Sequence, residues 1–134
     1  MRVLFVDDEP NVLDSIRRQL RKSCEVLTAT SGADALALLK DTGPVALVIS
    51  DMRMPGMSGA ELLAKIRDLY PDTVRMILSG QADLDSTIAA INDGHIFRFL
   101  TKPSHEDALR RAVVAGLEQH ELITTRKELL EKTL

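Results

Sequence analysis

Apolar and polar positions alternate along the chain in blocks that predict five strands and five helices. Short apolar, β-rich runs predict strands over residues 2–6, 25–29, 45–49, 74–78 and 96–100. Apolar residues at helical spacing predict helices over 11–20, between Ser31 and Gly43, between Ser58 and Pro71, over 84–93 and over 105–134. This alternation implies parallel strands, because each parallel pair needs a crossover helix. The predicted fold class is therefore α/β, with a doubly wound five-stranded parallel sheet and an extended last helix.

Local signals refine some of these segments. The run over 45–49 is the most continuous apolar strand and is typical of a strand buried on both faces. Ser31 and Ser58 are expected to cap the helices that follow them, and Glu61 stands at the spacing of a capping box. The helix over 84–93 places Leu84, Ile88 and Ile91 on one face.

Composition limits the kind of protein this is. A chain of 134 residues, 45% of them apolar, suits one domain with a real core. The single cysteine, Cys24, excludes an internal disulfide framework. No apolar run is long enough to span a membrane and no signal peptide is recognisable, so we expect a cytoplasmic protein. A formal charge of -3, with only 3% aromatic residues, argues against nucleic-acid binding by this domain.

The residues that follow the predicted strands carry the candidate chemistry. In a doubly wound parallel sheet, ligands bind beyond the carboxyl ends of the strands. The first strand delivers Asp7 and Asp8 to that edge, the third Asp51, the fourth Ser79 and the fifth Lys102. The first strand lacks the glycine-rich turn of dinucleotide-binding proteins, and no Walker A motif is present. A nucleotide cofactor is therefore disfavoured.

Three carboxylates at one edge call for a cation. Two carboxylates about 4 Å apart repel by about 4 kcal/mol at an effective dielectric of about 20. Carboxylate, carbonyl and water oxygens are the ligands that Mg²⁺ prefers, and no His or Cys stands at these strand ends to favour zinc. A metal with a lysine and a hydroxyl opposite forms a site for a phosphoryl group. Asp51 is the expected nucleophile because it follows the most apolar strand, which leaves Asp7 and Asp8 to hold the metal.

Four motifs follow the strands in order and carry a family resemblance. They are Val-Asp-Asp-Glu-Pro at 6–10, Ser-Asp-Met-Arg-Met-Pro-Gly-Met-Ser-Gly at 50–59, Leu-Ser-Gly at 78–80 and Phe-Leu-Thr-Lys-Pro at 99–103. Together they resemble the receiver domain of bacterial two-component response regulators, over about residues 2–118. The resemblance implies a flavodoxin-like fold with strand order 2-1-3-4-5. The segment 91–103 also resembles receivers that precede cyclic-di-GMP phosphodiesterase domains or sit in hybrid sensor kinases.

This resemblance implies a phosphoacceptor and a metal site. Asp51 would take the phosphoryl group from a sensor histidine kinase or a histidine phosphotransfer protein. Mg²⁺, or Mn²⁺ in its place, would be held by Asp51, by the backbone carbonyl of Arg53, directly by Asp8 and mainly through water by Asp7. The domain would not be a turnover enzyme, since it would catalyse only its own phosphorylation and dephosphorylation.

The resemblance also implies a switch. Ser79 would move toward the phosphoryl group, and Phe99 would turn inward with it. Lys102 would contact the phosphoryl oxygens, and a cis peptide bond would precede Pro103. The face formed by helix 84–93, strand 96–100 and the last helix would then control a C-terminal output domain or a partner, without contact to membrane or nucleic acid.

The last helical segment is longer than a compact domain needs, so residues 1–118 are expected to form the receiver and 119–134 an extension. A heptad-like apolar trace runs along it and consists of Leu109, Val113, Ile123, Leu130 and Leu134. Three residues interrupt this trace: Gly116, His120 and Lys127. The extension is either a solvated, frayed tail or a signalling helix. In the second case it leads to an output domain or forms a homodimer through residues 84–134.

Three alternatives remain open at this point. A hydrolase of the haloacid dehalogenase type also uses an aspartyl phosphate, but it needs Asp-x-Asp-x-Thr after the first strand, where this chain has Asp7-Asp8-Glu9-Pro10-Asn11. A pseudo-receiver would be an interaction module that never takes phosphate. A stand-alone receiver would relay phosphate without an output domain.

Overall fold

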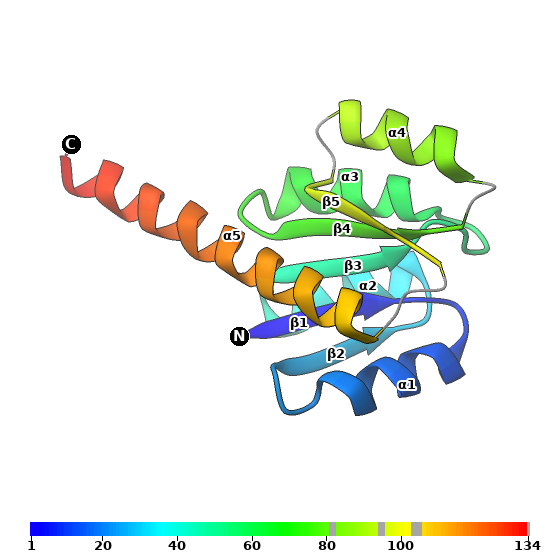
Figure 1. The fold of residues 1–134 in the computed structure, drawn as a ribbon. Coiled ribbons are helices and arrows are strands. Elements are labelled where there is room, and N and C mark those ends of the chain that lie inside the picture. Colours follow the sequence, from blue (N-terminus) through cyan, green and yellow to red (C-terminus); the bar gives the residue numbers. More distant parts are fainter. Residues whose placement is uncertain (81–82, 94–95, 103–105, 134) are drawn as a thin grey trace.

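The computed structural model describes residues 1–80, 83–93, 96–102 and 106–133 (Figure 1). Five parallel strands form one sheet in the order β2-β1-β3-β4-β5, as expected. The strands are β1 (Arg2–Val6), β2 (Glu25–Ala29), β3 (Leu47–Asp51), β4 (Val74–Ser79) and β5 (Arg98–Thr101). The predicted α/β class and strand order are therefore confirmed.

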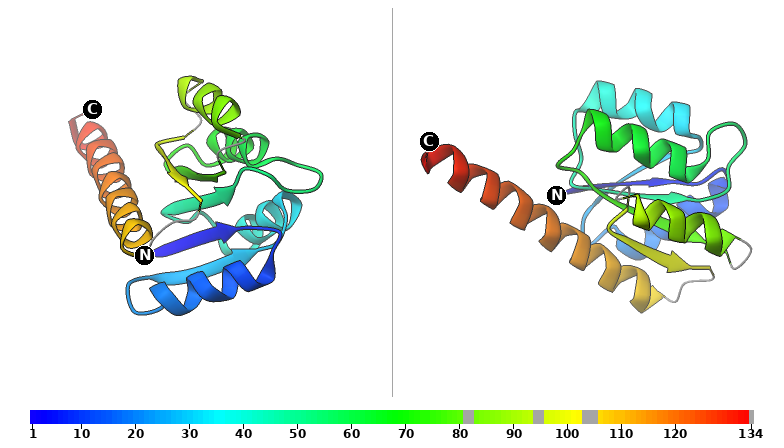
Figure 2. Two further views of the ribbon diagram at one scale, coloured as in Figure 1. Left: turned by 45° about the vertical axis from the view of Figure 1, so that its right-hand side comes forward. Right: turned by 90° about the horizontal axis from the view of Figure 1, so that it is seen from above.

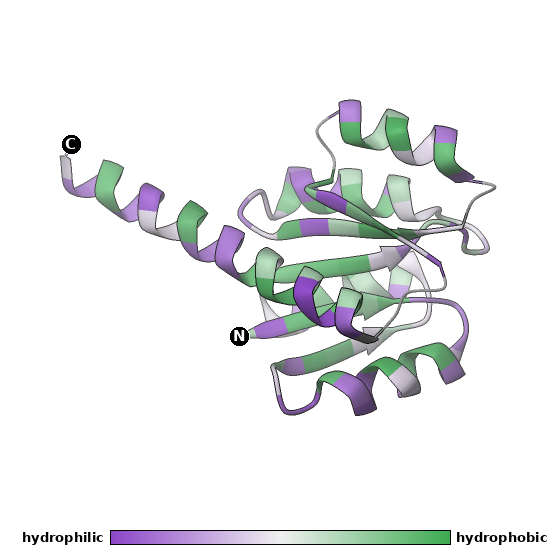
Figure 3. Cartoon of the chain, viewed as in Figure 1, coloured by the Kyte–Doolittle hydropathy of each residue, from purple (hydrophilic) through white to green (hydrophobic). Residues whose placement is uncertain are grey.

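Helices cover both faces of the sheet, which the two views of Figure 2 show. They are α1 (Pro10–Leu20), α2 (Gly32–Thr42), α3 (Gly59–Leu69), α4 (Leu84–Asn92) and α5 (Glu106–Thr133). One core cluster joins the sheet to α1 and α5, and it includes Phe5, Leu20 and Ala112. The other cluster lies on the opposite face and joins the sheet to α2, α3 and α4. In Figure 3 most of β1 and β3 is coloured green for apolar residues, as expected of strands that are covered on both faces.

Strand β3 is buried along its whole length, but it lies two residues later than predicted. Val45 and Ala46 are also buried, so hydrophobicity alone does not separate them from the strand. The strand instead continues through Ser50 and Asp51. This shift makes Asp51 the last residue of the central strand rather than part of a following loop.

The predicted serine caps are confirmed. Ser31 Oγ accepts a hydrogen bond of 3.0 Å from Asp34 N, and Ser58 Oγ accepts one of 3.2 Å from Glu61 N. The hydroxyl of Ser58 also donates to the Glu61 carboxylate. These bonds satisfy backbone donors that have no partner within the first helical turn.

Helix α4 buries only part of the face that its large apolar residues mark, since Ile91 packs against the core cluster but Leu84 and Ile88 do not. Leu84 and Ile88 are 42% and 44% exposed. Thr87 and Ala90 are the buried residues of this helix. Small side chains allow α4 to approach the sheet closely, and the polar Thr87 needs a hydrogen-bonding partner there.

The apolar trace of α5 packs against the protein's own sheet. Leu109, Val113 and Ile123 belong to the core cluster on that face or pack against it. A Cβ atom added at Gly116 would lie 2.8 Å from Leu47 Cδ2 and 2.9 Å from Met76 Cε. Glycine therefore interrupts the trace because the helix crosses β3 and β4 at this residue with no room for a side chain.

The two polar interruptions of the trace bind one loop. His120 Nδ1 lies 2.9 Å from the carbonyl oxygen of Asp72, and Lys127 Nζ lies 3.0 Å from Asp72 Oδ2. Helix α5 is thus continuous across residue 118 and contacts the body of the domain as far as Lys127. We call the contacts of His120 and Lys127 with Asp72 the clasp. Beyond the clasp, Leu129 and Leu130 are exposed. The division at residue 118 and the homodimer both stay predictions.

No described helix is long and apolar enough to cross a membrane.

Candidate functional site

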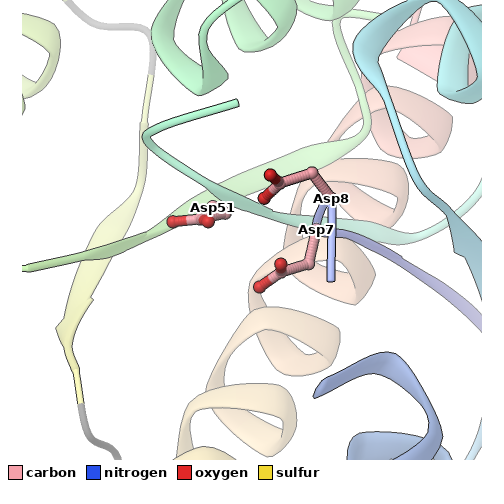
Figure 4. A group of neighbouring side chains, drawn as sticks. All are labelled: Asp7, Asp8 and Asp51. Carbon is pink, nitrogen blue, oxygen red and sulfur yellow. The ribbon is translucent and has the colours of Figure 1, made fainter. Parts of the chain in front are cut away.

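Three carboxylates meet at the carboxyl edge of the sheet, as the strand ends predict (Figure 4). Asp7 and Asp8 follow β1, and Asp51 ends the neighbouring strand β3. One carboxylate oxygen of each lies within 4.8 Å of the other two. Asp7 and Asp51 are buried, and Asp8 is exposed. The three acids therefore form a cluster that is open to solvent on the side of Asp8.

Lys102 supplies positive charge to this cluster. Its ammonium nitrogen lies 3.0 Å from Asp51 Oδ1 and 3.5 Å from Asp7 Oδ2. Its backbone N–H donates to the carbonyl oxygen of Ser79, which fixes the residue beside the end of β4. The predicted convergence of Lys102 on the acids is present in the structure.

Burial and charge act in opposite directions on these groups. Burial raises the pKa of Asp51, and Asp7 raises it further, whereas Lys102 and the backbone amide of Arg53 lower it; the net pKa lies above the ordinary value. Burial lowers the pKa of Lys102, but the charges of Asp51 and Asp7 outweigh it and raise the pKa overall. Lys102 is therefore a firmly protonated cation that only partly compensates its neighbours.

Asp7 leaves one oxygen without a hydrogen bond. Its Oδ1 accepts from Glu9 N at 2.9 Å, which orients the carboxylate. Its Oδ2 is buried and accepts no hydrogen bond from the described residues. The Lys102 ammonium 3.5 Å away offsets its charge in part, but a buried polar atom that accepts no hydrogen bond is costly. With two further carboxylates beside it, this oxygen fits a small divalent cation whose remaining ligands are waters.

Gly59 brings α3 close to the end of β3. A Cβ atom at this position would overlap the carbonyl oxygen of Asp51. Gly59 N also donates to the carbonyl oxygen of Met52 at 2.9 Å. The glycine thus lets the loop after Asp51 close tightly over the strand end.

Ser79, the last residue of β4, turns its hydroxyl toward α4. The hydroxyl oxygen lies 2.8 Å from Thr87 Oγ1 and 3.1 Å from the carbonyl oxygen of Gly80. Both Ser79 and Thr87 are buried. Sequence reasoning identified Ser79 but missed Thr87 as its partner.

A second connection links the loop after Asp51 to α4. Arg53 Nε lies 2.9 Å from Asp83 Oδ1, and Asp83 directly precedes the helix. The sequence contained a signal for one contact of Thr87, its hydrogen bond to the carbonyl oxygen of Asp83. A threonine hydroxyl in a helix can donate to the carbonyl oxygen four residues earlier. The ion pair of Arg53 with Asp83, 30 positions away, could not be predicted from sequence spacing.

The other predicted site residues have mixed outcomes. Phe99 lies in β5, half-buried, and packs against the core cluster of α2, α3 and α4. Its inward turn and the metal contact of the Arg53 carbonyl stay predictions. The predicted cis bond before Pro103 lies outside the described residues.

A groove of about 640 Å³ opens beside Lys102. Its walls come mainly from α1, with Val12, Ser15 and Ile16, and from Leu109 of α5. The lining is largely apolar, with polar groups from Glu9, Asn11 and Gln19 at α1. It therefore offers an apolar surface that extends to Lys102.

Comparison with known proteins identifies the class of protein. The family model for the response regulator receiver domain matches residues 3–114. The chain therefore belongs to the receiver domains of two-component response regulators, whose general function is phosphorylation on aspartate and which bind Mg²⁺ through acidic residues.

Individual relatives agree with this assignment. The chain is 39% identical over 116 residues to the hydrogenase transcriptional regulatory protein HoxA of Cupriavidus necator, covering 87% of the chain and 24% of that protein. A solved structure titled adenylate cyclase from Rhodopirellula baltica is 41% identical with a TM-score of 0.95, covering 98% and 97% of the two chains. A response regulator receiver domain from Clostridium thermocellum is 33% identical with a TM-score of 0.85, covering 91% and 98%.

The chain spans about a quarter of the length of the curated relatives first matched. The activities of those whole proteins are therefore not carried over to it. The relation to receivers of cyclic-di-GMP phosphodiesterases or hybrid kinases stays a prediction.

Proposed function

We propose that this chain accepts a phosphoryl group on Asp51 and uses it to change the surface around α4, β5 and α5. The observation that carries the proposal is the buried Asp51 carboxylate, held 3.0 Å from the Lys102 ammonium and beside two further acids. A nucleophilic oxygen and a fixed cation are what phosphoryl transfer requires of a protein.

The proposed transfer starts from a phosphohistidine. An oxygen of Asp51 forms a bond to phosphorus, and the bond from phosphorus to the imidazole nitrogen breaks. The electron pair of that bond stays with the imidazole, which then takes up a proton. Lys102 neutralises phosphoryl oxygens as negative charge spreads over them.

Asp7, Asp8, Asp51 and the backbone carbonyl of Arg53 are the proposed ligands of Mg²⁺ or Mn²⁺. The bound ion supplies positive charge to the phosphoryl oxygens. The buried Oδ2 of Asp7 supports this assignment, because it accepts no hydrogen bond and has only the Lys102 ammonium, 3.5 Å away, to offset its charge. Ser79 and Phe99 are the proposed switch residues.

The proposed phosphoryl donor is a sensor histidine kinase or a histidine phosphotransfer protein in the cytoplasm. The apolar groove between α1 and Leu109 supports docking there, because its lining includes Lys102, which contacts Asp51. We propose that the domain turns over no separate substrate and that its target is a C-terminal output domain or a partner. The relatives named as transcriptional regulators support an output domain.

A small-molecule donor tests the proposal without a known kinase. The chain is incubated with phosphoramidate and Mg²⁺, and intact mass is measured in wild type, Asp51→Asn and the matched variant Asp41→Asn, whose aspartate is an exposed acid of α2. We expect wild type and Asp41→Asn to gain one phosphoryl group, and Asp51→Asn to gain none. Labelling that persists in Asp51→Asn would move the acceptor elsewhere. No labelling of wild type would favour a pseudo-receiver.

A further inference from the structure

Thr87 is a polar side chain in an unexpected place. It is fully buried in α4, while Leu84 and Ile88 of the same helix are exposed. Burying a hydroxyl costs free energy unless it is hydrogen-bonded. Its contacts in the interior therefore need a structural reason.

The hydroxyl of Thr87 has two acceptors within reach. Its Oγ1 lies 2.8 Å from Ser79 Oγ and 2.9 Å from the carbonyl oxygen of Asp83, one helical turn earlier. A hydroxyl carries one proton and donates one hydrogen bond. Thr87 can donate to Ser79 while Ser79 donates to Gly80, or it can donate to Asp83 and accept from Ser79.

Because both hydrogen-bonding patterns are available, the Ser79 hydroxyl can leave Thr87 without leaving the Thr87 hydroxyl unpaired. When the Ser79 hydroxyl leaves, Thr87 still donates to Asp83, so no buried donor is stranded. When it returns, Thr87 holds it at α4 again. Ser79 ends β4 and pairs with β5, next to the strand that carries Asp51. Its hydroxyl is therefore positioned to choose between α4 and a group bound on Asp51.

We propose that Thr87 is a positioning residue that holds the Ser79 hydroxyl at α4 until a phosphoryl group on Asp51 competes for it. The inference rests on the proposed phosphorylation of Asp51. Thr87 then opposes activation, because its hydrogen bond must break when Ser79 turns to the phosphoryl oxygens. The ion pair of Arg53 with Asp83 ties the loop after Asp51 to the start of the same helix. This start of α4 therefore stays linked to the site when the Ser79 hydroxyl leaves Thr87.

Beryllofluoride with saturating Mg²⁺ is the probe, since it stands in for the phosphoryl group on Asp51. Its affinity is measured by amide NMR titration of the full chain. Thr87→Val removes the hydroxyl at nearly constant volume and is expected to bind beryllofluoride about two- to tenfold more tightly, the worth of one hydrogen bond. Thr87→Ser restores the hydroxyl and is expected to return to wild-type affinity. Ser86→Ala, which removes an exposed hydroxyl from the same helix, is the matched control.

A double-mutant cycle separates positioning from packing. In a Ser79→Ala background, Thr87→Val is expected to change nothing, because the hydroxyl it restrains is absent. An effect that persists there, or wild-type affinity in Thr87→Val, would overturn the inference and leave the proposed function intact. Failure of wild type to bind beryllofluoride would instead overturn the proposed function.

A measurement on the wild-type protein needs no substitution. Three-bond couplings that report χ1 of Ser79 are expected to change when beryllofluoride binds. An unchanged χ1 at saturation would refute the release of Ser79 even if Thr87→Val fails to fold.

Discussion

Replacing Asp8 with asparagine is expected to stabilise the metal-free protein. Asp8 shares its cluster with Asp7 and Asp51, with oxygens within 4.8 Å of one another. At that separation each like-charge pair costs about 3.5 kcal/mol at an effective dielectric of about 20, and about 1 kcal/mol in water. Asp8 is exposed, so the aqueous value is the better guide. Two pairs then give a gain of about 1–2 kcal/mol.

Asp8 is the informative acid to change because it loses no favourable contact. Lys102 pairs with Asp7 and Asp51, and no ion pair of Asp8 is found among the described residues. Asparagine keeps the size of the side chain and removes only the charge. The change in the free energy of unfolding therefore reports the net electrostatic effect of Asp8 in the cluster, its repulsion by Asp7 and Asp51 less its attraction to Lys102.

Urea denaturation in low-salt buffer with a chelator measures this change. Asp8→Asn is compared with wild type and with Asp14→Asn, which alters an exposed acid of α1 and is expected to shift stability by less than about 0.5 kcal/mol. The gain is expected to shrink at about 1 M salt, where the screening length falls to about 3 Å. Added Mg²⁺ is expected to stabilise wild type more than Asp8→Asn, because a ligand that binds the folded state stabilises it.

Two results would refute this reasoning. A metal-free Asp8→Asn protein less stable than wild type would show that the three acids do not repel one another appreciably. Equal stabilisation of both proteins by Mg²⁺ would show that Asp8 is not a metal ligand.

Three further predictions follow from the packing and the charges. Gly116→Ala is expected to lower the free energy of unfolding by about 0.5–2 kcal/mol in urea denaturation, because overpacking against Leu47 and Met76, about 1–3 kcal/mol, outweighs the gain of about 1 kcal/mol in helix propensity; a higher value would contradict the tight crossing. Asp72→Asn removes the ion pair with Lys127 and is expected to leave the global free energy of unfolding nearly unchanged, because the pair is exposed to solvent. It should nevertheless speed amide exchange over residues 124–133, and unchanged exchange would show that the clasp does not hold the helix. Burial raises the pKa of Asp51 in the metal-free protein, so its contribution to stability is present below the unfolded pKa, about 3.9, and is lost as pH rises through the higher folded pKa. Asp51→Asn should remove that decline from a curve of stability against pH, and a curve that keeps it would assign the titration to another group.

The sheet and the acid cluster were predictable for the same reason. Parallel strands end at one edge, so Asp7, Asp8 and Asp51 had to meet there once the alternation of strands and helices was recognised. Lys102 followed from its place after the last strand. These relations depend on topology alone, and the structure reproduces them.

The details that failed depend on how side chains share space. Strand β3 was placed two residues early because Val45 and Ala46 are as buried as the strand itself. Apolar spacing marked the face of α4 that carries Leu84, Ile88 and Ile91, yet only Ile91 of these packs against the core. The buried residues, Thr87 and Ala90, lie on the adjoining side of the helix. A hydrophobicity pattern measures transfer from water and contains no information on which side chain fits closest, so Thr87 stayed hidden.

The apolar trace of α5 was a similar case. Its spacing is that of a coiled coil, but packing on the sheet requires the same spacing. Only the contacts of Gly116, His120 and Lys127 distinguish the two, and they assign the interruptions to the crossing of the sheet and to the loop at Asp72.

The clasp at Asp72 has a consequence for anything joined to the end of α5. The helix of 28 residues is about 42 Å long at about 1.5 Å per residue, and it is held to the body as far as Lys127. The receiver therefore fixes the rotation of the helix about its own axis. A reporter domain fused rigidly to the helix would have its orientation fixed in the same way. Each residue inserted after Thr133 would turn that reporter by about 100°, and seven residues would nearly restore the original angle. A series of such fusions would therefore vary the angle of the reporter about the helix axis in known steps.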